Sequence, residues 1–228
     1  MDTLVELREG WHWPKNDKRC WRATSRHWKL PQEVIKEIAN KRVAVQAGGN
    51  CGVYAEQYAK AFETVYTFEP ENLNFYCLCR NLINCKNIYK FQSFLGTGQE
   101  TTTSITNPAD LQSEANSGMF HKTNTQGSIP VLSIDQLGLT ACDLIHLDIE
   151  GGEHDALIGA TQTINKFKPV VCLEWFQNTE ILQKTMSDFG YQDIGFASKS
   201  DKTFASLCVL HSLLRYVHRV DCIVRIHL

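Results

Sequence analysis

The segment VQAGGNCG, residues 45–52, decides the fold, because it joins an apolar run to a helix-type segment through three glycines. Open α/β sheets bind their ligands beside such turns, at the carboxyl ends of their strands. Glycines let the backbone approach a ligand, and the free amides at the start of the next helix bind a carboxylate. The segment therefore predicts a ligand-binding turn after the first strand of a parallel sheet.

The spacing of this turn excludes two common phosphate-binding motifs. A dinucleotide fingerprint that begins at Gly48 needs glycine where the chain has Asn50 and Val53. A P-loop needs a lysine after its last glycine, and none follows Gly52. Glu69 ends the next apolar run, in the context VYTFEP, where an acid is suited to hydrogen-bond ribose hydroxyls. We therefore expect a nucleoside ligand without a pyrophosphate or triphosphate.

Short apolar runs alternate with helix-type segments from Arg42 onward, which is typical of a parallel sheet covered by helices. The fold class predicted is α/β. The expected strands lie at residues 42–47, 64–68, 88–94, 143–148, 169–174 and 191–197. The expected helices lie at residues 31–39, 53–62, 70–82, 153–165 and 179–189.

Two regions interrupt this alternation, and they set the expected domain organisation. Residues 1–40 form an extension with a helix, and residues 41–228 form one domain with a polar insertion at about residues 97–127. The insertion has no apolar period, so it predicts a long loop, either an acceptor-binding lid or a disordered segment. The early part of the tail after residue 207 is compatible with a last antiparallel strand.

Four of the five tryptophans lie in the first 30 residues, among lysines and arginines: Trp11, Trp13, Trp21 and Trp28. Such a segment can stack on sugars or bases, or it can pack onto the core through its indoles, which is the interpretation that we favour.

Charge and composition exclude further classes of function. The formal net charge of -2 gives no general attraction for nucleic acid or an anionic membrane. No run approaches the length of a membrane span, so we expect a cytoplasmic protein without a membrane partner. The nine cysteines are expected to be free thiols in a reducing compartment, and the absence of a CxxC pair argues against a zinc site.

A second motif, CDLIHLDIEGGEHDAL, residues 142–157, runs an apolar strand into three acids. Strand alternation places Asp148 and Glu150 on one side, and Glu153 lies in the first turn of the next helix. Acids at the end of a central strand are costly unless they meet a ligand, a cation or a donor. The motif therefore predicts a functional site at Asp148, whereas His146 is expected to pack in the core and His154 is a weaker candidate.

Five blocks in order resemble the FkbM-type methyltransferases: GxNxG, FEP, PVLSIDQL, LDIEGGE and CLEW. The resemblance covers about residues 42–176 and implies a Rossmann-like class I methyltransferase fold, with a mostly parallel sheet and helices on both faces. It implies S-adenosylmethionine as cofactor and a reaction centre at or beside Asp148, Glu150 and Glu153. The positions implied to hold the cofactor are Gly48, Asn50, Gly52, Glu69 and Gln46, the last standing where the family has an aspartate.

The reaction implied is methylation of a hydroxyl on a sugar, a glycan or a small molecule. Asp148 is the expected general base, and the alternative is Mg²⁺ held by Asp148 and Glu174. Two other functions remain open. The Trp-rich N-terminus motivates nucleic-acid methylation, and Gln46 motivates a non-catalytic module that binds S-adenosylmethionine.

Overall fold

The computed structural model describes residues 2–26, 28–106, 116–123, 125–175, 178–196 and 201–206. The strand expected early in the tail and part of the expected insertion lie outside these residues.

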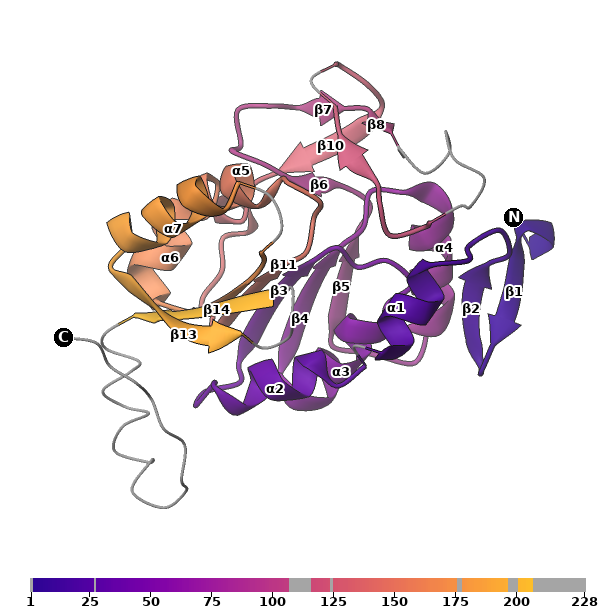
Figure 1. The fold of residues 1–228 in the computed structure, drawn as a ribbon, viewed down its shortest axis with the longest axis horizontal. Helices are drawn as coiled ribbons and strands as arrows, with labels where there is room; N and C mark the ends of the chain where they lie inside the picture. Colours follow the sequence, from indigo (N-terminus) through magenta and orange to yellow (C-terminus); the bar gives the residue numbers. More distant parts are fainter. Residues whose placement is uncertain are drawn as a thin grey trace.

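A seven-stranded sheet forms the centre of the molecule (Figure 1), in the order β13-β14-β12-β11-β3-β4-β5. The middle of the sheet is parallel. Strand β11 pairs in parallel with β3 and β12, and β4 pairs in parallel with β3 and β5. An antiparallel hairpin of β13 and β14 closes one edge. The strands are β3 (Val43–Ala47), β4 (Thr64–Phe68), β5 (Ile88–Phe91), β11 (Leu144–Leu147), β12 (Val170–Glu174), β13 (Tyr191–Phe196) and β14 (Asp201–Ser206).

The order of the strands reverses between β3 and β11. The chain adds β4 and β5 on one side of β3, and later places β11 and β12 on its other side. Ligands bind outside the carboxyl ends of the strands at such a switch point. The sheet therefore brings the glycine turn after β3 next to the acidic motif after β11.

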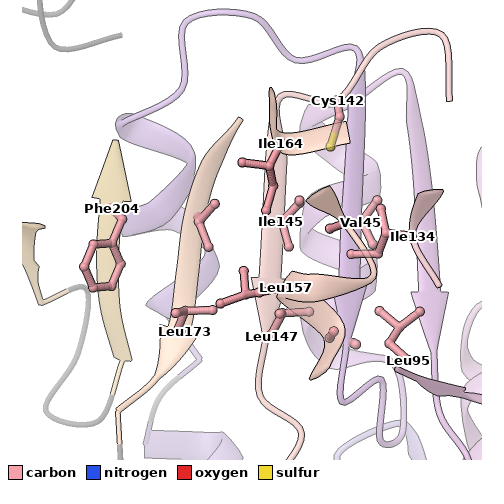
Figure 2. Close-up of a cluster of buried hydrophobic side chains, with 14 of the residues drawn as sticks. Val45, Leu95, Ile134, Cys142, Ile145, Leu147, Leu157, Ile164, Leu173 and Phe204 are labelled. Atoms are coloured by element: carbon pink, nitrogen blue, oxygen red, sulfur yellow. The ribbon is translucent and has the colours of Figure 1, made fainter. Parts of the chain in front are cut away.

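Helices cover both faces of this sheet, as predicted. Helices α2 (Leu30–Lys36) and α3 (Val53–Ala61) pack against one face through a cluster that includes Val34 and Tyr58. Helices α5 (Glu153–Ile158), α6 (Thr161–Phe167) and α7 (Thr179–Asp188) cover the other. Figure 2 shows the cluster on that second face, where Leu157 and Ile164 lie against Ile145 and Leu173. Each such side chain contributes about 1.5–3 kcal/mol when fully buried.

The single helix expected at residues 153–165 was wrong, because the chain forms α5 and α6 with a break at Gly159. A side chain at Gly159 would meet the carbonyl oxygen of Gly96 at 2.0 Å, so another loop passes directly over the break. The carboxylate of Asp135 accepts hydrogen bonds from the backbone of Gln162 and Thr163 at 2.9 and 2.8 Å. A distant residue thus starts the second helix.

The N-terminal segment forms a hairpin of β1 (Val5–Arg8) and β2 (Trp11–Pro14), followed by α1 (Cys20–Arg26). Strand β2 packs against α4 (Asn72–Asn81). Trp13 is completely buried, and its ring meets that of Trp21 edge to face at 5.1 Å. Trp11 and Trp28 make a similar contact at 5.5 Å, so the indoles join the segment to the core.

The insertion region contributes short strands. A three-stranded sheet, β6-β10-β7, is built from Phe94–Leu95, Ile129–Leu132 and Thr102–Thr103. Strands β8 (Ile105–Thr106) and β9 (His121–Lys122) pair with each other, and a 3-10 turn, Asp135–Leu137, follows β10. Another 3-10 turn, Asp2–Leu4, begins the chain. Among the described residues, no helix is long and apolar enough to cross a membrane.

Candidate functional site

A cavity of about 280 Å³ lies at the switch point of the sheet. It is lined by the turn after β3, the ends of β11 and β12, the start of α4, the N-terminal segment and residues 116–120. The predicted residues Gly48, Asn50, Glu69, Asp148 and Glu150 all border it. The structure thus brings the two sequence motifs into one cavity.

The glycine turn and the acidic motif touch through their backbones. Gly48 has φ +82°, and a Cβ atom there would lie 1.9 Å from the carbonyl oxygen of Asp148. The amide of Asp148 donates to the carbonyl oxygen of Ala47 at 3.2 Å, which continues the pairing of β11 with β3. Only glycine at position 48 allows this approach, which holds the backbone of Asp148 against the glycine turn.

Glu69 lies at the end of β4 and is only 5% exposed. Its Oε2 accepts from the amide of Asn50 at 2.7 Å, and its Oε1 accepts from the amide of Glu71 at 2.9 Å. Burial raises the pKa of Glu69 to about 7, against the lowering effect of these two amides. Each carboxylate oxygen keeps a lone pair that a ligand hydroxyl can use.

Two predicted cofactor residues do not line the cavity. Gln46 is completely buried, where its Nε2 donates to the carbonyl oxygen of Gly48 at 2.9 Å and its Oε1 accepts from Thr67 at 2.6 Å. Gly52, with φ +92°, faces the side chain of Leu82 rather than the cavity. Both residues therefore support the turn on the side that faces away from the cavity.

Three carboxylates meet at the ends of β11 and β12. Ligand atoms of Asp148, Glu150 and Glu174 lie within 4.8 Å of one another. Burial, with the nearby charges of Asp148 and Glu153, raises the pKa of Glu150 to about 8. Glu150 therefore carries a proton near neutral pH, which reduces the repulsion in the cluster.

The third acid of the motif has a different position. Glu153 is 2% exposed and does not line the cavity, and its Oε1 accepts from the amide of Ile149 at 2.9 Å. This bond closes the loop that carries Asp148 and Glu150. His146 is fully buried and bonded to the Tyr58 hydroxyl at 2.7 Å, as expected of a core residue, and His154 does not line the cavity.

Sequence reasoning missed the residues that cover the cavity. Ser117 and Asn74 are buried in its wall, with Trp13 of the N-terminal hairpin. The position of Asn74, in the first turn of the helix after the FEP block, is a signal that could have revealed it. Ser117 lies in a polar stretch without period, so no local pattern marks it.

A profile described as the methyltransferase FkbM domain matches residues 46–192, which is more than half of the chain. No match was found among curated proteins.

Several solved structures are similar in fold. Methyltransferase FkbM from Methylobacillus flagellatus KT is 17% identical with a TM-score of 0.48, covering 81% of this chain, and this chain spans 60% of that one. A SAM-dependent methyltransferase from Aquifex aeolicus is 10% identical, with a TM-score of 0.46 and coverage of 82% of this chain and 96% of the other. M. jannaschii TYW2 in complex with AdoMet is 12% identical, with a TM-score of 0.45 and coverage of 89% and 86%.

The Aquifex protein depends on S-adenosylmethionine, and TYW2 is in complex with the same molecule, AdoMet. The family match and the strand order of the sheet agree on a methyltransferase fold. The glycine turn and Glu69 lie where the sequence motifs of that fold predict them. The chain belongs to the FkbM family of S-adenosylmethionine-dependent methyltransferases.

Proposed function

We propose that this protein methylates a hydroxyl group of a sugar, a glycan or another small molecule. The observation that carries the proposal is that the Asp148 side chain borders the same cavity as the cofactor turn. Methyl transfer to a hydroxyl needs a proton acceptor next to the methyl donor, and a carboxylate at this position supplies one.

The residues of the cavity fit S-adenosylmethionine. Glu69 offers acceptor oxygens for ribose hydroxyls, and the glycines of the turn let its backbone approach the ligand. The amides of residues 49–52 already donate within the protein, so the turn contributes its shape rather than a carboxylate site. When bound, the cofactor supplies an electrophilic methyl group on its sulfonium. The cavity volume of about 280 Å³ lies at the low end of pockets for drug-sized ligands, about 300–1,000 Å³. The cofactor alone therefore fills most of it, and the acceptor hydroxyl enters at the edge near the carboxylates.

Asp148 takes the acceptor proton in this proposal, and Glu150 assists in its protonated form. A protonated Glu150 can donate a hydrogen bond to an acceptor oxygen or to a neighbouring carboxylate, but it cannot take a proton. Alignment of the hydroxyl with the methyl group, and displacement of water by the two bound molecules, provide the rest of the rate.

In the alternative mechanism, Asp148 and Glu174 would hold Mg²⁺, which would lower the pKa of the acceptor hydroxyl. The three clustered carboxylates are compatible with a cation, but close acidic groups are common without one. The direct base is preferred because it needs only groups that the chain itself provides. Turnover that survives exhaustive chelation would exclude the metal alternative.

The remaining alternatives are less well supported. The indoles pack against the core and against one another, which favours a structural role for the segment that motivated nucleic-acid methylation. Gln46 holds the turn from behind, so the lost charge of the family's aspartate does not by itself argue for an inactive module. Every cysteine that the structure describes is free, which supports a reducing compartment such as the cytoplasm.

Two measurements test the proposal. Calorimetry with S-adenosylhomocysteine, the demethylated product of the cofactor, is expected to show binding at one site. Methyl transfer is then measured on a panel of mono- and oligosaccharides, small alcohols and single-stranded oligonucleotides, and only hydroxyl compounds are expected to be methylated. Transfer to oligonucleotide bases alone would overturn the choice of acceptor, and absence of cofactor binding would overturn the function.

A further inference from the structure

Asn74, in the first turn of α4, has a side chain that its protein environment satisfies only in part. The residue is 2% exposed and lines the cavity. Its Nδ2 donates to the carbonyl oxygen of Ser117 at 2.6 Å, which fixes the orientation of the amide group, since the carbonyl can only accept. Its Oδ1 is buried and has no hydrogen-bond partner among the residues that the structure describes.

A buried acceptor without a partner is rare in a folded protein and calls for an explanation. Here a ligand provides one, because the residue borders the cavity close to Glu69, whose pKa the Asn74 side chain helps to lower. If Glu69 binds the ribose, the missing donor is a hydroxyl or amino group on the adenosine part of the same molecule. The inference thus rests on the proposed use of S-adenosylmethionine.

The other end of the Asn74 side chain holds a segment that crosses the cavity. We call residues 116–122 the strap. The carbonyl oxygen of Ser117 accepts from Asn74 and also from Nδ2 of Asn50, at 3.0 Å, and the Ser117 amide donates to Asp17 at 3.0 Å. The peptide groups of Ser117 are therefore bonded to the cofactor turn, to α4 and to the N-terminal segment.

The strap is also attached to the acidic side of the cavity. Nδ1 of His121 donates to the carbonyl oxygen of Glu150 at 2.8 Å. Lys122 forms ion pairs with Glu100 at 2.7 Å and with Asp155 at 3.1 Å. The strap thus runs from the glycine turn to the loop that carries Glu150, and its residues 116–120 line the cavity between them.

We propose that Asn74 is a cofactor-binding residue that couples cofactor binding to closure of the strap. Its Oδ1 accepts a hydrogen bond from the adenosine part, and its Nδ2 holds the strap closed over the bound molecule. Cofactor binding then fixes the amide group in the orientation that bonds Ser117, and a closed strap slows release of the cofactor product.

The test uses the full chain and S-adenosylhomocysteine. Asn74→Leu keeps the branched shape of the side chain but removes both hydrogen-bonding atoms, and the smaller Asn74→Ala is the second variant if the first does not fold. Asn87→Leu is the matched control, because Nδ2 of Asn87 also donates to backbone carbonyls, those of Ala59 and Phe62 at 2.9 Å, outside the cavity. Calorimetry gives the affinity, and stopped-flow tryptophan fluorescence gives the dissociation rate.

We expect Asn74→Leu to weaken binding by about 10- to 100-fold, the effect of one or two lost hydrogen bonds, and to speed dissociation. Asn87→Leu should change the affinity less than 2-fold. In the wild type, S-adenosylhomocysteine should slow hydrogen exchange at the Ser117 amide.

Three results would overturn the inference in different ways. Equal affinity in Asn74→Leu and wild type removes Asn74 from the site. Equal weakening in the Asn74 and Asn87 variants reduces its role to fold stability. An unchanged rate of hydrogen exchange at the Ser117 amide on ligand binding would show that the cofactor does not stabilise the closed strap. If the wild type fails to bind S-adenosylhomocysteine, the proposed function itself is overturned, and that outcome is distinct from the other three.

Discussion

At the scale of single residues, Asp148 and Glu150 have different expected roles. Glu150 already carries a proton near pH 7, because burial and its acidic neighbours raise its pKa to about 8. Glu150→Gln imitates that neutral form, so turnover at pH 7 should stay within a few-fold of wild type. Asp148→Asn removes the proton acceptor and should lower turnover by about 10²–10⁴, with cofactor affinity within a few-fold. The check is steady-state methyl transfer with a hydroxyl acceptor, and wild-type turnover in Asp148→Asn would exclude the mechanism.

Glu69 makes cofactor binding dependent on pH. Burial raises its pKa to about 7, so the free protein loses the carboxylate as the pH falls through that value. In the proposed site, ribose hydroxyls donate to the ionised form, so we expect the affinity to be complete above about pH 8 and to fall below pH 7. S-adenosylhomocysteine should bind about tenfold more weakly at pH 6 than at pH 8. Calorimetry at both values tests this, and Glu69→Gln should bind more weakly with no such pH dependence. A wild-type affinity equal at both values would contradict the role of Glu69.

At the scale of elements, the close approach of β3 and β11 depends on Gly48. Gly48→Ala puts a Cβ atom 1.9 Å from the Asp148 carbonyl oxygen, so the strand ends must separate. Gly190→Ala is the matched control, because Gly190 has a similar φ of +79° but nothing within 4 Å of the added atom. The control should lose about 1–2 kcal/mol of unfolding free energy, the cost of the left-handed conformation. Gly48→Ala should lose clearly more and should also lose cofactor binding. Urea unfolding and calorimetry measure both, and equal losses of stability would refute the close approach.

At the scale of the whole molecule, Asp17 joins the N-terminal segment to the strap. This buried carboxylate accepts from Nε1 of Trp13 at 2.7 Å, from the amide of Trp21 at 2.8 Å and from the amide of Ser117 at 3.0 Å, and it pairs with Arg8. The first 26 residues therefore form part of the cavity wall rather than an independent extension.

Asp17→Asn tests this connection. It should lower the free energy of unfolding by about 2–4 kcal/mol, because a buried acceptor of several hydrogen bonds loses its charge. It should also weaken S-adenosylhomocysteine binding by about tenfold, through the loosened strap. Asp135→Asn weakens the hydrogen bonds that cap α6 outside the cavity, so it should lower stability without changing affinity. Thermal unfolding and calorimetry on both variants provide the measurement. An unchanged affinity in Asp17→Asn would show that the N-terminal segment does not contribute to ligand binding.

The sequence by itself determined the parts of this protein that are coded locally. The strands expected at residues 64–68 and 169–174, the turn at Gly48 and the acids Glu69 and Asp148 follow from apolar periodicity and from residues that end a strand. A residue that ends a parallel strand lies at the edge of the sheet where ligands bind, so its position can be predicted from the local pattern.

The tertiary structure alone decided which distant residues complete the site. Asp17 and Ser117 are 100 residues apart, and Asn74 and Ser117 are 43 residues apart, so no periodic pattern connects them. The break at Gly159 depends on the passing backbone of Gly96, and Gly52 faces Leu82 rather than a ligand. Such contacts arise only when separate elements pack, because a hydrogen bond or a steric limit between them leaves no signal in either segment alone.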